Sequence, residues 1–595
     1  MQLQRFCIGW VLCVLVSTAS LSAAPRWLRL ETEDFVIVSD ARESDIVEFA
    51  AGYSGYRYAF RRLFLPDGKR VPRSQILLFR HGSDFESRVP QPKDGRSRTI
   101  CHGGDLDGGA FLALAVDGDR EAALKIAYEF ETIWGLRRSG YNIPLWMSQG
   151  AGEVLCSLQM RKGKCIVGER PTGFDEIGAS ALRWPRFFDV NTGSAEYSGR
   201  EAKGVFHEQA WALMHWILLR DEETLSRFQA LADAVHAQPS SEAVQSVMQV
   251  KTDELTKTIN RHLFGFQTRK IDFDEAAVRA SYRIVPATEA EAHALLANLA
   301  AESDRPVEAD RELQIAQKLA PDAPYVQEAL ARREMRERRV NEAAVFYRRA
   351  IEAGSTNPRA YVISAMARLN ESSSGGVDYS GGGGRNVEVA LGDLRHALEL
   401  DPGNTEAYQQ LGRAFFLAPT PSAAGLDELA RGVTDDPKTL SVLEYRAALL
   451  QRLKRTDEYL DQLQAIVTHP DAPPQTVQRL EKRWLKGVLD RDIAKMNALV
   501  AKHEFAEAAA FVEAERKTPA GERLQGEYEQ MAEYVGEQSS WVALRRLRQE
   551  QHWAEAAEAA QKYLDVYPKS KRLAAVEKLR DEARQHLASS NQGTR

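Results

Sequence analysis

The residues best suited to acid–base chemistry lie within residues 119–160, where Glu129, Glu131 and Glu153 stand on two predicted helices. A carboxylate can take or give a proton at a reacting atom when its pKa lies near the working pH. Catalysis by these three carboxylates without a metal is therefore one hypothesis. The competing explanation is that they belong to the solvated faces of their helices, as most helical carboxylates do.

The histidines do not complete a metal-binding motif in the sequence. His207-Glu208 begins like the zinc motif HExxH, but Trp211 stands where the second histidine is required. His207 and His215 would lie ~12 Å apart along one helix, too far for a single zinc ion with bonds of about 2 Å. His215 lies in an apolar run and is predicted to be a core histidine with satisfied hydrogen bonds. A GxSxG nucleophile elbow and a recognisable catalytic cysteine pattern are also missing from the sequence.

The cysteines allow two interpretations. Cys156 and Cys165 flank a turn-like segment and could form a disulfide between a helix end and the next strand, or stay as buried thiols. Metal binding has little support, because no further sulfur or histidine lies close to them in sequence. Five cysteines in 595 residues exclude a scaffold built on disulfides.

Composition and charge limit the classes of protein. At roughly 150 residues per domain, 595 residues correspond to about four domains. Hydrophobic residues make up 44% and charged residues 27%, which excludes wholesale disorder and a polytopic membrane protein. With a net charge of −6, the chain as a whole lacks the excess of positive charge that nucleic-acid binding requires, so no nucleic-acid partner is expected.

Residues 1–24 are predicted to be a signal peptide. Arg5 precedes the apolar run Cys7–Val16, and small residues follow up to Ala24. The run is short for the ~30 Å hydrocarbon core of a membrane. Pro25 disfavours cleavage after Ala24, so an uncleaved N-terminal anchor stays an alternative. The mature chain is expected to be periplasmic or extracellular, without a membrane span.

Residues 26–285 are predicted to form an α+β domain. Short β-branched or aliphatic runs predict strands at 34–39, 74–79 and 110–116. The glycine-rich stretch 103–109 is expected to lead into the last of these strands, and it lacks the ending of a phosphate-binding loop. Apolar spacing predicts helices, with a short hairpin after the third of them, at 43–63, 119–138, 144–159, 200–219, 222–235 and 240–263.

Residues 288–585 are predicted to be helical repeats. Small and large apolar residues recur with a period of 34, and a Gly/Ser-rich insert near 371–385 lengthens one interval by 13 residues. The recurring triplets are Ala309, Leu313 and Ala316; Ala343, Tyr347 and Ala350; and Ala390, Leu394 and Ala397. The pattern resembles the tetratricopeptide repeat. This resemblance implies an all-α solenoid whose groove binds a protein or peptide partner.

The first region resembles the peptidase-MA-like (gluzincin) domain of secreted bacterial proteins. The resemblance rests on the PLW sequence that opens the helix at 144–159, on the GxxE segment within that helix, and on Gly204–Leu219. In active relatives, two histidines of an HExxH helix and a glutamate of the next helix bind zinc. The intervening glutamate is the general base.

This sequence departs from the family at every ligand position. The two histidine positions hold Tyr128 and Thr132, and the third-ligand position holds Gln149. A phenol, a hydroxyl and an amide cannot replace two imidazoles and a carboxylate as zinc ligands. Glu129 keeps the general-base position as a vestige, and Glu153 is expected to be structural. We therefore expect a degenerate site without metal or cofactor.

Three functions are consistent with these patterns. The favoured one is an exported, non-catalytic pseudopeptidase that binds a protein or peptide, or acts as a scaffold, through its repeats. The alternative is a peptidase-like hydrolase with a non-standard site around Glu129. In the third, the first domain is only a cap for the solenoid.

Overall fold

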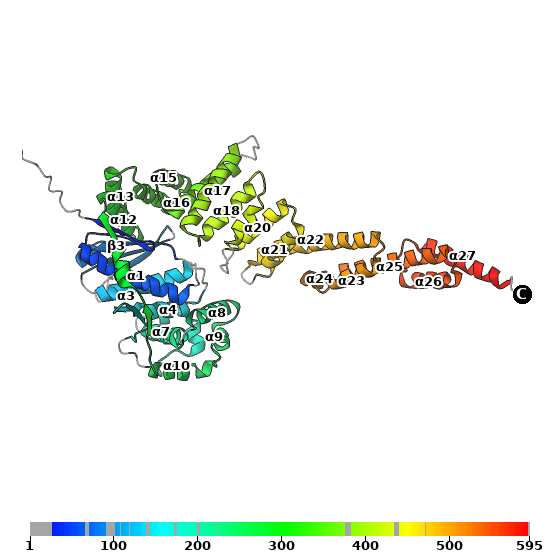
Figure 1. The fold of residues 1–595 in the computed structure, drawn as a ribbon, viewed down its shortest axis with the longest axis horizontal. Helices are drawn as coiled ribbons and strands as arrows, with labels where there is room; N and C mark the ends of the chain where they lie inside the picture. The colour runs from blue at the N-terminus through cyan, green and yellow to red at the C-terminus, as the bar shows by residue number, and fades with distance from the viewer. Residues whose placement is uncertain are drawn as a thin grey trace, which may run out of the picture. The chain divides into compact units, whose positions relative to one another are not determined.

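Figure 1 shows the computed structural model. It describes residues 27–65, 71–90, 101–107, 109–117, 120–138, 143–171, 174, 176–198, 203–221, 223–374, 382–432, 439–469 and 472–592. The predicted signal peptide and the centre of the Gly/Ser-rich insert lie outside these residues. The chain divides into two compact units, Met1–Thr420 with Arg431–Thr439 and Pro421–Ala430 with Leu440–Arg595. Among the described residues, the helices are all too short or too polar to cross a membrane.

A six-stranded mixed sheet organises the first unit. The strand order is β4-β5-β3-β2-β1-β9; β3 is parallel to β2 and β5, and the other pairs are antiparallel. The strands are β1 (Leu28–Glu31), β2 (Phe35–Ser39), β3 (Ser74–Phe79), β4 (Cys101–Leu106), β5 (Gly109–Ala115) and β9 (Arg283–Pro286). The strands predicted at 34–39, 74–79 and 110–116 are thereby confirmed, as β2, β3 and β5, to within one residue at each end.

The glycine-rich stretch differs from its prediction, because most of it is the edge strand β4. Cys101 of β4 lies opposite Leu114 of β5. A Cβ atom on Gly103 would lie 2.7 Å from the ring of Phe130, which comes from helix α3 (Arg120–Arg138). A glycine inside a strand often marks such a close approach. Gly103 therefore lets the helix α3 approach the edge strand closely.

One face of the sheet packs on the main core of the unit. Alternate residues of the central strands, Ile37, Ile76, Leu78, Leu112 and Leu114, are buried there. They contact the helices α1 (Glu43–Phe64), α3 and α4 (Leu145–Cys156). These three helices carry most of the residues that could do chemistry.

Helix α12 (Glu289–Glu302) covers the other face of the sheet, beside β3 (Figure 1). Its residues Leu295, Leu296 and Leu299 pack on Leu77 and Phe79 of β3. A different side of the same helix is buried against the next helices of the chain through Ala290, Ala294 and Ala297. The change of sequence character near residue 285 is therefore not a boundary between two separate cores.

The rest of the first domain is helical, with a small sheet in the order β6-β7-β8. The predicted helix over 240–263 is two helices, because Gln249 adopts a left-handed conformation with φ 55° and ends the first of them. The elements are β6 (Gln159–Arg161), β7 (Lys164–Val167), α5 (Trp184–Phe188), α6 (Ala195–Ser198), α7 (Lys203–Leu219), α8 (Thr224–Ala237), α9 (Ser240–Met248), α10 (Leu255–Phe264), β8 (Arg269–Asp272) and α11 (Glu275–Ala280).

Helical hairpins complete the first unit. Consecutive helices pack most extensively as the pairs α12–α13, α14–α15 and α16–α17. The recurring positions of the repeat pattern lie on the second helix of each pair, and all are buried except Ala309, which is half-buried. The helices are α13 (Pro306–Leu319), α14 (Pro324–Arg336), α15 (Val340–Glu352), α16 (Pro358–Ser374), α17 (Gly382–Leu400) and α18 (Thr405–Leu417).

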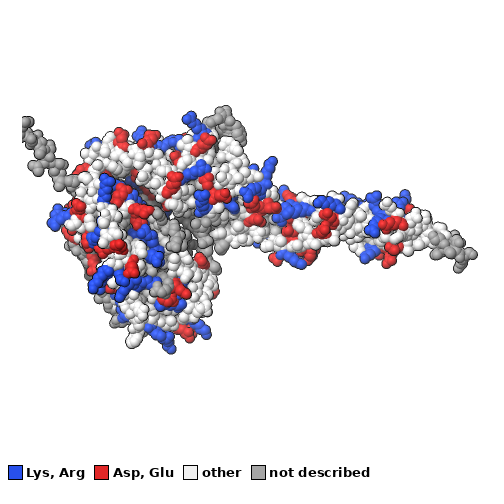
Figure 2. Space-filling view, in the orientation of Figure 1, with Lys and Arg blue, Asp and Glu red and all other residues white. Residues whose placement is uncertain are grey.

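The second unit is entirely helical in its described part. Its buried residues form small clusters between neighbouring helices and no single large core. Lys/Arg and Asp/Glu side chains alternate over its visible face (Figure 2). The helices are α19 (Ala424–Ala430), α20 (Leu440–Arg452), α21 (Thr456–Val467), α22 (Pro474–Ala501), α23 (Phe505–Glu515), α24 (Pro519–Arg523), α25 (Gln525–Gln549), α26 (Trp553–Val566) and α27 (Leu573–Gln592).

Candidate functional site

Two of the three residues at the positions that the resemblance assigns to zinc ligands, Tyr128 and Thr132, face the core. The ring of Tyr128 stacks on Tyr56 of α1, with centroids 4.5 Å apart and an interplanar angle of 5°. The hydroxyl of Thr132 lies 3.0 Å from the Tyr56 hydroxyl and donates a hydrogen bond to the carbonyl of Tyr128. Both side chains are buried. They stabilise the packing of α3 on α1.

Glu131 belongs to a buried ionic network. Its carboxylate accepts hydrogen bonds from Ser74 at 2.6 Å, from Arg57 at 3.2 Å and from Tyr53. Burial, followed by the nearby Glu131 charge, raises the pKa of Tyr53 well above its ordinary value, so the phenol remains a donor. This carboxylate is fully paired and enclosed, which removes it from the candidate acid–base residues.

Glu129, Gln149, Glu153 and His207, named here the Glu129 cluster, come together from three helices. Gln149 and Glu153 lie one turn apart on α4 and so share a face. His207 Nδ1 lies 2.6 Å from Glu153 Oε1. The amide nitrogen of Gln149 donates to Glu129 and, at 3.2 Å, to Glu153. Two carboxylates, an amide and an imidazole therefore converge on one point.

Two glycines of α4 allow this convergence. A Cβ atom on Gly150 would lie 2.4 Å from the carbonyl oxygen of Ala210, so α4 approaches α7 as closely as backbone permits. A Cβ atom on Gly152 would lie 3.1 Å from Cγ of Glu129 on α3. Because α4 packs closely against both α3 and α7, Glu129 of α3 and His207 of α7 both lie beside Gln149.

The electrostatic potential around the cluster is negative. The ring of Tyr197 on α6 stacks on His207 with centroids 5.7 Å apart. Burial, and next the charge of Glu129, raise the pKa of this phenol. Burial, followed by Glu153 and Glu129, raises the pKa of the Cys156 thiol well above its ordinary value. The potential of the two carboxylates thus disfavours further negative charge and favours a cation.

Cys101, Cys156 and Cys165 are free thiols. Cys156 donates to the carbonyl of Glu153 at 3.1 Å, whereas Cys165 of β7 lies below Gly55 of α1, with Sγ 3.4 Å from the carbonyl oxygen. The disulfide considered between Cys156 and Cys165 is therefore not formed in this structure, because the two thiols point to different neighbours.

His215 is a core histidine, as predicted. Its Nε2 lies 3.0 Å from the carbonyl oxygen of Gly168, and its Nδ1 lies 2.9 Å from Nε2 of His262. Burial, and next the neighbouring His262, lower the pKa of His215 to about 3. His207, in contrast, joins the Glu129 cluster, which the sequence did not predict. A search for HExxH considers residues of one helix only, whereas the partners of His207 lie on α3 and α4.

A second polar assembly joins the sheet to the helical hairpins. Asp107, at the β4–β5 turn with φ 55°, is bound by Arg332, by the hydroxyl of Tyr347 at 3.0 Å and by the amide of Asn357 at 2.7 Å. Burial alone would raise the pKa of Asp107, but Arg332 and Arg359 hold it below its usual range. The sequence could not reveal this residue, because its partners lie more than two hundred positions away.

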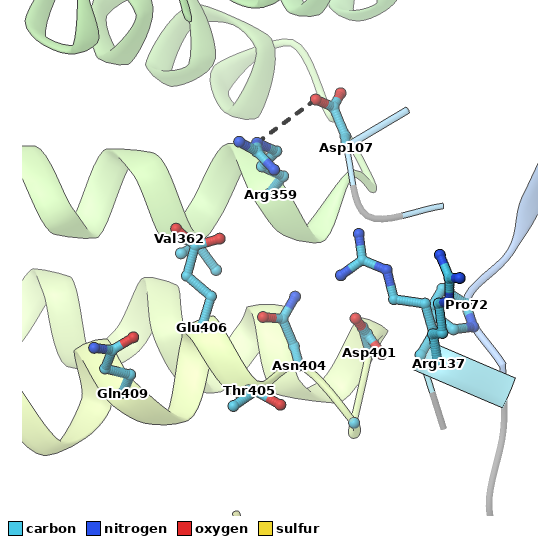
Figure 3. Close-up of a pocket in the computed structure, with 12 residues that line it drawn as sticks. Pro72, Asp107, Arg137, Arg359, Val362, Asp401, Asn404, Thr405, Glu406 and Gln409 are labelled. Carbon is cyan, nitrogen blue, oxygen red and sulfur yellow. Dashed lines mark ion pairs between the residues drawn. The ribbon is translucent and has the colours of Figure 1, made fainter. Parts of the chain in front are cut away.

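A cavity of about 310 Å³ adjoins Asp107 (Figure 3). Arg137 and Arg138 contribute from the end of α3, Arg359 and Val362 from α16, and residues 401–409 from the start of α18 and the turn before it. Arg359 pairs with Asp107 at 3.8 Å. The lining carries both charges and several neutral hydrogen-bonding groups.

Comparisons with known proteins do not add a family to this description. No protein-family model matches the chain, and no curated protein matches its sequence.

Proposed function

We propose that the chain is an exported, non-catalytic pseudopeptidase with tetratricopeptide-like repeats, and that it binds a protein or peptide partner or acts as a scaffold. The observation that carries this proposal is the burial of Tyr128 and Thr132 against Tyr56. At both positions where an active relative needs a zinc-binding histidine, the side chain is part of the helix packing and contacts Tyr56 of α1.

The cavity beside Asp107 supports a binding role. A peptide backbone offers both donors and acceptors, and the cavity matches both kinds: Arg137 and Asn404 donate, while Asp401 and Glu406 accept. Its walls come from the sheet domain, from α16 and from the start of α18 with the turn before it.

Binding to a library of unstructured peptides tests the proposal. We expect the full chain to bind a subset of peptides and to leave them uncleaved. Arg137→Ala and Asn404→Ala should each weaken binding at least tenfold. The control Arg311→Ala, at an exposed arginine of α13, should leave binding unchanged. Equal affinity of the cavity variants and the control would contradict a peptide site in this cavity.

The hydrolase remains the second candidate, because Glu129 and Glu153 lie beside an imidazole in the Glu129 cluster. A carboxylate and an imidazole are suited to general acid–base catalysis. If the bound peptides are cleaved, Glu129→Gln should abolish cleavage, while Glu121→Gln, an exposed glutamate of the same helix, should not. Cleavage that persists in Glu129→Gln would remove this candidate.

A further inference from the structure

The Glu129 cluster contains three groups of the kind that bind metal ions. Glu129, Glu153 and His207 each offer one ligand atom, and the three atoms lie within 4.8 Å of one another. Ligands of one tetrahedral ion with bonds of about 2 Å are roughly 3–4 Å apart. Small rotations of these side chains would close that difference, because none of the three is fully enclosed.

These residues are not the zinc ligands of the peptidases that the chain resembles. Those ligand positions hold Tyr128, Thr132 and Gln149, and the first two face α1. His207 comes from α7, which supplies no ligand in the HExxH arrangement. Apart from Gln149, which holds the third-ligand position, the cluster is therefore a different donor set, made by other residues in the same region of the fold.

Gln149 gives an independent indication of a ligand. The side chain is fully buried, and its amide oxygen has no hydrogen-bond partner among the described residues. Its amide nitrogen points into the cluster, 3.1 Å from His207 Nδ1 and 3.2 Å from Glu153 Oε1. The oxygen and nitrogen of an amide exchange places by a half-turn about the last side-chain bond. After this turn the unpartnered oxygen faces the point where the three ligand atoms meet.

The donor set selects a class of cation. Two carboxylates balance a divalent charge, and an imidazole nitrogen suits Zn²⁺ and the neighbouring transition metals. Ca²⁺ and Mg²⁺ prefer all-oxygen sites with six or more ligands. We propose that Glu129, Glu153 and His207, with the amide oxygen of Gln149, bind a divalent transition-metal ion that ties α3, α4 and α7 together. This inference does not depend on peptide binding.

Titration of the metal-free full chain with Zn²⁺ and Mn²⁺ tests the proposal. We expect one equivalent to bind in calorimetry, with a rise in Tm of about 3 °C or more at saturating metal. Glu153→Gln and His207→Ala should weaken binding at least tenfold, whereas the control Glu121→Gln should bind as the wild type does. Absence of a bound equivalent, or equal affinity in all variants, would overturn the proposal.

A measurement on the wild type covers the case in which a variant fails to fold. Diethyl pyrocarbonate modifies accessible imidazoles, and peptide mass spectrometry reports each histidine separately. Zn²⁺ should slow the modification of His207 at least fivefold and leave His81, which is 52% exposed, unaffected. Unchanged modification of His207 in saturating Zn²⁺ would also refute the site.

Discussion

Asp107 should be the residue whose loss most weakens the junction between the sheet and the helical hairpins. Its side chain is 7% exposed and its main partner Arg332 is 8% exposed. Replacement by alanine leaves the Arg332 guanidinium buried, with Glu328 at 3.5 Å as its remaining ion-pair partner. Breaking a buried ion pair costs about 3–5 kcal/mol. We take about 3 kcal/mol, because Glu328 still compensates part of the charge.

The backbone adds to this cost. Asp107 has φ 55°, a conformation that alanine adopts at a penalty of about 1 kcal/mol and that asparagine tolerates. The expected loss is therefore about 4 kcal/mol for Asp107→Ala. Asp107→Asn keeps an acceptor oxygen and the backbone conformation, so its loss should be about 2 kcal/mol.

Amide hydrogen exchange measured by mass spectrometry reports the free energy of local opening. For Asp107→Ala, we expect amides of β4, α14 and α16 to exchange up to about a thousandfold faster than in the wild type. Asp310→Ala, at an exposed carboxylate of α13, is the control and should change exchange by less than about twofold. A change below tenfold for Asp107→Ala, or equal effects of the alanine and asparagine variants, would refute the argument.

Three further predictions concern the core. Because the folded-state pKa of His215 is depressed to about 3, its contribution is present above the unfolded pKa near 6.5 and is lost as pH falls. Unfolding by denaturant should show a loss of about 2 kcal/mol between pH 7 and pH 5, and His215→Gln should flatten this dependence; an unchanged slope would contradict it. Gly150→Ala should lower stability by about 2–3 kcal/mol because its Cβ meets backbone, whereas Gly204→Ala, with open space around it, should be neutral or slightly stabilising; equal Tm values would disprove the packing argument. Alkylation of the denatured protein without reductant should label all three thiols, Cys101, Cys156 and Cys165. An intact mass that shows two labels fewer than this would indicate a disulfide and contradict the prediction.

Sequence patterns predicted the helices and strands that form because of residues near one another in the chain. The strand β3 and the helices α1 and α3 follow from apolar spacing, and the buried alanines of α13, α15 and α17 follow from the 34-residue period. The strand β4 was missed because its glycines carry no apolar signal. The need for a glycine at position 103 follows only from the folded structure, in which the ring of Phe130 occupies the space of a Cβ atom.

The candidate site was predicted only in part, for the same physical reason. Tyr128, Thr132 and Gln149 were identified from the resemblance to the peptidase family, but such a resemblance does not say which face of α3 meets α1 and which meets α4. The packing of three helices decides that question. It turns Tyr128 and Thr132 toward α1 and joins Gln149 to His207, a residue for which a search for a motif within one helix finds no partner.

Helix α12 also determines when the first unit can fold during synthesis. The ribosome releases the strands β1 to β5 first, but the outer strand β9 and the cover of Leu77, Phe79 and Phe111 arrive only with residues 283–302. Until then the growing chain presents an apolar sheet face and an open strand edge, both of which favour aggregation. A truncated gene that stops at residue 282 would hold the protein permanently in that state. A version ending after the α14–α15 hairpin would include the strand β9, the helix α12 that covers the sheet, and the helices α13 and α14 that bury the other side of α12.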